Sequence, residues 1–260
     1  MRRAVAAMFA LSLNGQTPPP DAAPQGAILA RMKDAAVHYA DRLQDFLCVE
    51  RIKRSKEDSG PFKHWQVLET QEREVGYIAH QEHSRLLKVN GKPPGTTKMK
   101  PGYFVPSGEF GLTMGYIFDP KSAAEFEWDH EETSGGPRLC VFRYRVTTEN
   151  GTMTLYADGD RIHMRHHGLV YADCESGAPM RVQIETEPVS VMRSGQKIVL
   201  GWRIDVRYAM TAIAGTEFLL PQTSEETVRY GASQTKVEIQ FQQYRKYESS
   251  STVMFDTDGK

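Results

Sequence analysis

The sequence lacks an apolar run approaching the roughly 18 residues that a membrane-spanning helix requires. It also lacks an excess of either charge: 32 Lys and Arg residues stand against 33 Asp and Glu residues, a net charge of −1. A balanced chain creates no whole-molecule field that favours nucleic acid or an anionic membrane. We therefore predict no transmembrane segment in the mature chain and no nucleic-acid partner.

Motifs of the common catalytic and cofactor sites are missing as well. There is no GxSxG elbow, no HExxH, no phosphate-binding Gly-rich loop and no dinucleotide fingerprint. Nothing in the sequence brings a Ser, a His and an Asp together. The absence of a motif does not exclude an enzyme, but it favours a non-enzymatic protein and predicts no cofactor.

Cysteine is scarce, with only Cys48, Cys140 and Cys174. Neither a CxxC nor a zinc-ribbon spacing occurs, so no structural zinc site is indicated. In an oxidising compartment three cysteines permit one disulfide and one free thiol, and the spacings nominate no pair.

The N-terminus differs from the rest of the chain. Arg2 and Arg3 precede the apolar run "AVAAMFALSL" (residues 4–13), and a Pro-rich stretch follows. This order is typical of a secretory signal peptide, although an untargeted N-terminus is the alternative. We predict a signal peptide at residues 1–15, a Pro-rich linker at 16–26 and a single domain at 27–256, located in a periplasm or secreted.

Apolar residues spaced three and four apart predict two helices. Ile28, Leu29, Met32 and Ala36 begin such a stripe over residues 27–43. A shorter helix is predicted over residues 107–118, capped by Ser107 and ended by Asp119-Pro120.

Elsewhere apolar and polar residues alternate. In "GWRIDVRY", Trp202, Ile204 and Val206 alternate with Arg203 and Asp205, and "EFEWDHEE", "CVFRYRV" and "KVEIQF" follow the same rule. Such alternation is typical of antiparallel strands with one buried face. About ten strands separated by Gly-rich turns predict an α+β fold, in which a large curved antiparallel sheet carries one or two helices on its apolar face.

The stretch "RIHMRHHGLVYADCESG" (residues 161–177) gathers five metal-ligand side chains. As a strand, it would hold His163 and His167 about 13 Å apart at roughly 3.3 Å per residue, with His166 on the other face. We therefore predict no metal site here. Asp173 and Gly177 are instead expected to shape a hairpin turn, with Asp173 accepting backbone hydrogen bonds.

Two runs of like charge have ordinary explanations. The acidic row Glu125, Glu127, Asp129 and Glu131 would suit a cation or a glycosidase, but pairing with arginines on a neighbouring strand such as Arg143 is the simpler interpretation. The basic run "RIKRSK" (residues 51–56) places its charges on both faces of a strand, which is a weak nucleic-acid signal.

Three blocks, "DFLCVERIKR", "SGEFGLTMGYIFDPKSAAEFEWD" and "HGLVYADCESGAPMRV", resemble a family of uncharacterised secreted bacterial proteins. The last block is also similar to a turn in periplasmic lipoprotein carriers (LolA/LolB-like) and RseB-type regulators. That resemblance implies an unclosed half-barrel with helices in its mouth and a hydrophobic ligand.

A hydrophobic ligand requires an inner sheet face with more apolar side chains than the helices cover. The candidate ligand-binding residues are Met114, Ile117, Phe126, Trp128, Phe142, Tyr144, Met164, Trp202, Ile204 and Phe241, each of which could equally be plain core. The leading hypothesis is a binding protein for a lipid, an acyl group or a lipidated protein. The alternatives are an envelope interaction or stress-regulatory protein, whose sheet face or residues 90–106 bind another protein, and then a hydrolase.

Overall fold

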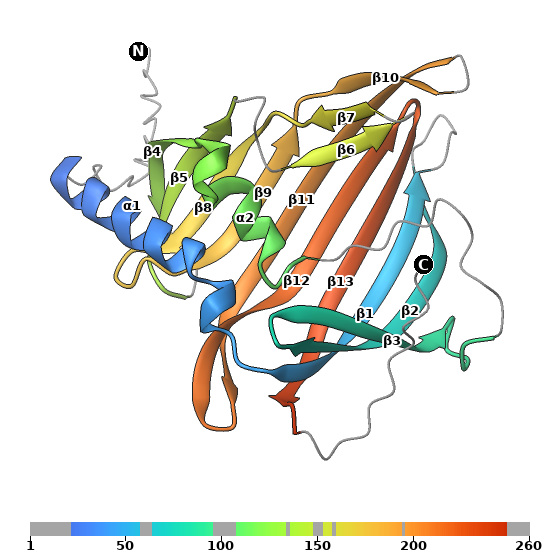
Figure 1. The fold of residues 1–260 in the computed structure, drawn as a ribbon, viewed down its shortest axis with the longest axis horizontal. Helices are drawn as coiled ribbons and strands as arrows, with labels where there is room; N and C mark the ends of the chain where they lie inside the picture. Colours follow the sequence, from blue (N-terminus) through green and yellow to red (C-terminus); the bar gives the residue numbers. More distant parts are fainter. Residues whose placement is uncertain are drawn as a thin grey trace, which may run out of the picture.

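The computed structural model describes residues 22–57, 64–95, 108–133, 136–147, 153–157, 160–193 and 196–248. Its helices are α1 (Ala22–Val37) and α2 (Leu112–Phe118), with short 3-10 turns at Ala40–Arg42 and Pro120–Ser122 (Figure 1). Its strands are β1 (Phe46–Glu57), β2 (Trp65–Ile78), β3 (Gln81–Val89), β4 (Glu125–Glu132), β5 (Leu139–Val146), β6 (Thr154–Ala157), β7 (Asp160–His163), β8 (His166–Asp173), β9 (Pro179–Thr186), β10 (Val189–Arg193), β11 (Gln196–Ile213), β12 (Thr216–Tyr230) and β13 (Ser233–Lys246). The predicted signal peptide, the predicted cap Ser107 and most of residues 90–106 lie outside the described residues.

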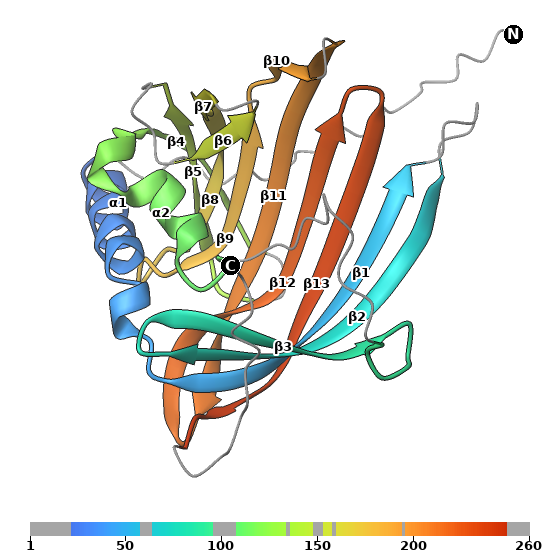
Figure 2. The ribbon, with the colours of Figure 1, turned by 45° about the vertical axis from the view of Figure 1, so that its right-hand side comes forward.

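One antiparallel sheet dominates the fold, with the strand order β3-β2-β1-β13-β12-β11-β9-β8-β5-β4. β10 pairs with one end of β11, and β6 and β7 form a separate hairpin. Among the described strands the two outer ones, β3 and β4, do not pair with each other, so the sheet curves without closing (Figures 1 and 2). This confirms the predicted unclosed half-barrel.

The alternation in the sequence sets the two faces of this sheet. On β11, Ile204, Val206 and Tyr208 are buried, whereas Arg203 and Arg207 are exposed. We call the face of Ile204 the inner face and the face of Arg203 the outer face. Both helices lie over the inner face (Figure 2).

On the outer face, ion pairs join the neighbouring strands β4 and β5, as the sequence predicts for the acidic row. Arg143 on β5 binds Asp129 and lies 4.0 Å from Glu127 on β4. Arg138 donates to Glu131 at 3.3 Å. Glu127 and Asp129 are therefore paired with Arg143 as predicted. Glu131 departs from the predicted solvated row: the register shifts between Trp128 and His130, and the Glu131 side chain is 11% exposed and lies beside the Cys140 and Cys174 sulfurs.

Helix α1 buries the stripe that its periodicity predicts. The buried positions of α1 and the turn after it are Ile28, Met32, Ala36, Tyr39 and Leu43. The helix begins at Ala22, five residues before the predicted start. Pro24 is compatible with this start because backbone N–H groups in a first helical turn have no intrahelical partner. The helix ends at Val37, and a 3-10 turn completes the predicted span.

Helix α2 ends at Phe118 as predicted but begins at Leu112, later than expected. Gly108 explains the late start: its φ of +108° is not helical, and a Cβ there would lie 2.5 Å from the Leu112 Cβ. After the helix, Asp119 accepts a hydrogen bond of 2.8 Å from the Lys121 backbone and opens the next 3-10 turn.

The histidine-rich stretch forms two strands, so the prediction of one continuous strand was wrong. β7 ends at His163 and β8 begins at His166. Between them Met164 donates its backbone N–H to the Met153 carbonyl at 2.9 Å, which holds the chain in the β6–β7 region before it joins the main sheet.

The turn after β8 matches its prediction. Gly177 has a φ of +79°. The Asp173 carboxylate accepts backbone hydrogen bonds from Glu175 at 3.2 Å and from Ser176 at 2.7 Å. β9 then returns antiparallel to β8. Within the part of the chain that the structure describes, no helix has both the length and the apolarity needed to cross a bilayer.

Candidate functional site

All ten residues predicted to line a hydrophobic site lie in or against one apolar cluster, between the sheet and helices α1 and α2. Seven are buried in it: Met114, Ile117, Phe142, Tyr144, Met164, Ile204 and Phe241. Phe126, Trp128 and Trp202 are half-buried at its margin. Alternation along the strands thus located the cluster, and ligand binding by these residues stays a prediction.

Aromatic pairs fill much of this cluster. Trp128 meets Phe142 edge-to-face with ring centroids 5.4 Å apart. At the other side, Phe241 meets Phe110 at 5.6 Å. Such packing stabilises the core by about 0.5–1.5 kcal/mol per pair beyond area burial. The interior near these rings is therefore occupied by side chains.

The cluster meets solvent at an apolar cleft of about 270 Å³ between the end of α1 and the β11–β12 hairpin. Its lining residues are Ala35, Tyr39, Arg42, Leu43, Ala178, Pro179, Met210, Glu217, Phe218 and Leu219. Tyr39 and Leu43 belong to both the cleft and the apolar cluster. Met210 is 49% exposed and so presents an apolar side chain to solvent in the cleft. The volume lies just below the roughly 300–1,000 Å³ found for small-molecule pockets.

A larger depression of about 430 Å³ lies on the outer face, and most of its lining residues are charged or polar. Its carboxylates are paired with arginines: Arg203 donates to Glu185 at 3.1 Å, and Arg181 donates to Asp205 at 2.8 Å. Although burial opposes it, hydrogen bonds from Arg181 and Gln183 hold the pKa of Asp205 below its usual value. The depression suits a polar ligand and not an apolar one.

The sequence did not predict a group of four glutamates in which each affects the charge of at least one other: Glu50, Glu82, Glu109 and Glu226. Glu50, Glu109 and Glu226 are buried, whereas Glu82 is exposed and accepts a hydrogen bond of 3.4 Å from the Gly108 backbone N–H. Burial, with the nearby Glu109 carboxylate, raises the pKa of Glu50 to about 8 and that of Glu226 to about 8. Burial and the Glu82 carboxylate raise the pKa of Glu109 to about 7. At neutral pH Glu50 and Glu226 are therefore mainly protonated. We call these four residues the acid cluster.

His166 and His167, neighbours in the histidine-rich stretch, lie in different environments on the two faces of β8. His166 is buried, with its Nδ1 3.4 Å from the Tyr144 hydroxyl, and burial lowers its pKa to about 4. His167, on the opposite face of β8, is exposed. His166 is thus a neutral core residue at pH 7.

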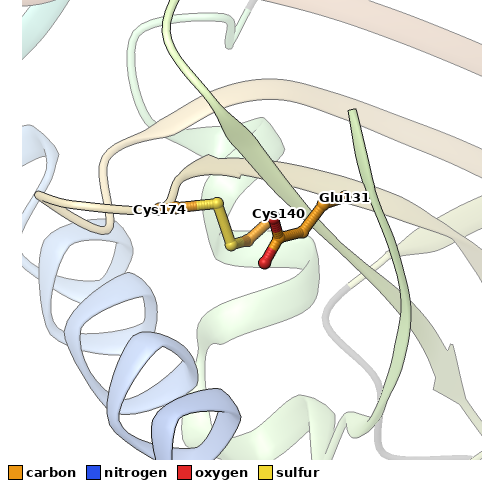
Figure 3. A group of neighbouring side chains, drawn as sticks. All are labelled: Glu131, Cys140 and Cys174. Carbon is orange, nitrogen blue, oxygen red and sulfur yellow. A yellow bond between two sulfur atoms is a disulfide. The ribbon is translucent and has the colours of Figure 1, made fainter. Parts of the chain in front are cut away.

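Among the described side chains, one group of three has potential ligand atoms within 4.8 Å of one another: Glu131, Cys140 and Cys174 (Figure 3). The two sulfurs are joined as a disulfide, so neither is a thiolate available to a metal. The bond links β5 to the turn after β8 and settles the pairing that the sequence left open. Cys48 is buried and unpaired, and burial raises the pKa of its thiol.

Two features of the site escaped the sequence analysis. The cleft residues Phe218 and Leu219 adjoin the Ala214-Gly215 turn, and an apolar run beside a hairpin turn was the available signal. The residues of the acid cluster come from β1, β3, β12 and the turn before α2, so no local sequence pattern predicts it.

Comparison with known proteins finds distant structural likeness. No protein-family model matches the sequence, and no curated protein does. Similar solved structures are a candidate outer membrane lipoprotein-sorting protein domain from Vibrio parahaemolyticus (11% identity, TM-score 0.34, covering 90% of this chain and 93% of that chain), a LolA superfamily protein from Nitrosomonas europaea (10%, 0.32, 86% and 93%) and a DUF1329 family protein from Desulfovibrio piger (11%, 0.37, 86% and 94%). These matches are a distant likeness in fold alone. This likeness assigns no activity.

Proposed function

We propose that the protein is a non-enzymatic binding protein for a hydrophobic ligand, such as a lipid, an acyl group or the acyl chains of a lipidated protein. The observation that carries the proposal is the apolar cleft beside α1, which shares Tyr39 and Leu43 with the apolar cluster. A ligand bound there gains about 25 cal/mol for each Å² of apolar surface removed from water, before ordering costs.

The contacts between α1 and the rest of the fold support this proposal. Arg31 donates a hydrogen bond to the Cys174 carbonyl at 3.1 Å, and the Tyr77 hydroxyl donates to the Ala40 carbonyl at 3.3 Å. The Lys33 ammonium also lies 4.8 Å from the centroid of the Phe126 ring on β4. The buried side of the helix is otherwise apolar. An acyl chain that slides between α1 and the sheet therefore exchanges one apolar contact for another.

The disulfide supports a location in a periplasm or outside the cell, because such bonds persist in oxidising compartments. This agrees with the signal peptide predicted at residues 1–15. A carrier in that compartment would solubilise acyl chains between membranes.

The test uses protein purified gently from membrane-containing cells. Native mass spectrometry should detect bound lipid, and titration with a fluorescent fatty acid should give saturable binding. Met210→Glu places a charge in the cleft and should weaken probe binding at least tenfold. Met192→Glu is the matched control, because Met192 is 56% exposed and lies far from the cleft. Absence of both bound lipid and saturable binding would refute the proposal.

A further inference from the structure

Exposed apolar side chains gather at one end of the sheet. Of the nine large apolar residues that are exposed in the described part of the chain, six lie within four residues of a strand end there: Trp65, Val67, Leu68, Met192, Val199 and Tyr230. Scattered exposed apolar residues are normal, whereas a cluster marks an interaction surface.

The strand pairing brings these six residues to one edge. The residue pairs at the ends of the three strand pairs are Glu57–Trp65, Tyr230–Ser233 and Arg193–Gln196. Because β1 pairs with β13 and β12 pairs with β11, these ends lie side by side, as the upper edge of the sheet in Figure 2 shows. We call this edge the rim.

The rim is basic although the whole chain is balanced. Its strand ends, residues 56–57, 64–68, 189–193, 196–200 and 228–236, contain five basic residues and one acidic residue, Glu57. The basic residues are Lys56, Arg193, Lys197, Arg229 and Lys236. Lys236 is paired with Glu225 at 3.9 Å and with Glu238 at 3.6 Å. Within the described residues Lys197 and Arg229 are exposed and make no ion pair, so their charges are available to a partner.

Trp65 and Lys236 place an aromatic ring and a basic group side by side in the rim. The Lys236 ammonium lies 5.2 Å from the centroid of the Trp65 ring, within cation–π range. Tryptophan favours the boundary between water and acyl chains, and lysine favours the headgroups just outside it.

We propose that the rim docks on the surface of an anionic phospholipid bilayer. The apolar and aromatic side chains enter the boundary between headgroups and acyl chains, while Lys197 and Arg229 contact lipid phosphates. A purely apolar partner surface would leave Lys197 and Arg229 unpaired, and a purely acidic one would leave Trp65 and Met192 in water. An anionic bilayer satisfies both sets.

Docking through the rim fixes the orientation of the ligand cleft. Met210 in the cleft and Val199 in the rim lie on the same strand, eleven residues apart, which corresponds to about 36 Å. A docked molecule therefore holds its cleft away from the bilayer, toward the aqueous space. The inference rests on the rim residues alone and stands whether or not the cleft binds a ligand.

The test is flotation of the full chain with vesicles of phosphatidylethanolamine and phosphatidylglycerol, compared with phosphatidylcholine vesicles. The wild-type protein should float with the anionic vesicles and be released by high salt. The double variant Lys197→Glu, Arg229→Glu should bind roughly tenfold more weakly or worse, since each basic residue near an anionic surface contributes roughly fivefold.

A second pair of variants distinguishes vesicle binding by the rim from ligand binding by the cleft. Trp65→Ala with Met192→Glu should lose vesicle binding and keep fatty-acid binding, whereas Met210→Glu should do the reverse. The substituted side chains are all exposed, so the variants should keep the wild-type melting temperature: Trp65, Met192, Lys197, Met210 and Arg229. The inference is overturned if the wild-type protein ignores anionic vesicles, or if the rim variants bind them as well as the wild type.

Discussion

The Tyr208 hydroxyl on β11 donates a hydrogen bond of 3.2 Å to the backbone carbonyl oxygen of Glu109, and both residues are buried. The bond ties the middle of the inner face to the turn that precedes α2. It therefore fixes one end of the helix that, together with α1, covers the apolar cluster.

Tyr208→Phe should lower the free energy of unfolding by about 1–3 kcal/mol, because the buried Glu109 carbonyl loses its partner while the ring is kept. Urea denaturation measures this as a lower midpoint with an unchanged m-value. An unchanged midpoint would mean that the bond adds nothing to the anchoring of α2.

Reduction of the Cys140–Cys174 disulfide should lower the free energy of unfolding by about 3–4 kcal/mol, the loop-closure value for a sequence separation of 34 residues. Thermal melts with and without reductant measure the loss. The Cys48→Ala variant should stay sensitive to reductant, since Cys48 is unpaired, and a Cys140→Ser, Cys174→Ser variant should be insensitive. Sensitivity in the double variant would contradict this assignment.

Gly177 and Gly91 form a matched pair for measuring how closely the β8–β9 turn approaches α1. Both have positive φ, +79° and +75°, but a Cβ on Gly177 would lie 2.6 Å from the Arg31 Cβ, whereas a Cβ on Gly91 meets nothing within 4 Å. Gly91→Ala should lower the free energy of unfolding by about 1 kcal/mol from backbone strain alone. Gly177→Ala should lower it by about 1–3 kcal/mol more, through overpacking against α1. Equal losses in chemical denaturation would mean that the turn and helix separate easily.

Local patterns in the sequence predicted what depends on local chemistry. The alternation in "GWRIDVRY" placed Ile204 and Val206 on the inner face, and the Asp173 turn has the geometry expected of it. The break at Met164 was missed because Ile162, Met164 and His166 keep alternating through it. At the break the Met164 backbone N–H bonds to the Met153 carbonyl, and the Arg165 carbonyl accepts from the Glu187 backbone, partners that the alternation does not reveal.

Features formed by segments that lie far apart in the sequence could not be predicted from local sequence patterns. The cleft joins α1 to the β11–β12 hairpin, across most of the chain. The disulfide was one of three possible pairings until the sheet brought Cys140 to the end of β8. Likewise Glu226 is one of many glutamates in polar strand sequence, and its burial follows from its register in the sheet, opposite the buried Ile204 and Val237.

The acid cluster gives the protein an unusual dependence on pH. Burial raises the pKa values of Glu50 and Glu226 to about 8 and of Glu109 to about 7, above the roughly 4.3 of an unfolded chain. Between those values the folded state holds protons that the unfolded state has released, so the free energy of unfolding falls as pH rises. His166, with a folded pKa of about 4, acts in the opposite direction, and its contribution is lost as pH falls below about 6.5.

Glu226→Gln separates these effects, because glutamine keeps the shape of the neutral acid and does not titrate. Between pH 6.5 and 8, where His166 of the folded protein is already neutral, the variant should lose stability less steeply than the wild type, by up to about 1.4 kcal/mol per pH unit. Titration of His166 in the unfolded chain contributes equally to both proteins. Urea denaturation across this range measures the slope. Glu225→Gln is the matched control: Glu225 is exposed on the outer face, and its variant should keep the wild-type slope. A Glu226→Gln variant with the wild-type slope would show that Glu226 is already ionised in the folded protein at pH 6.5, and that its burial is relieved by opening of the inner face.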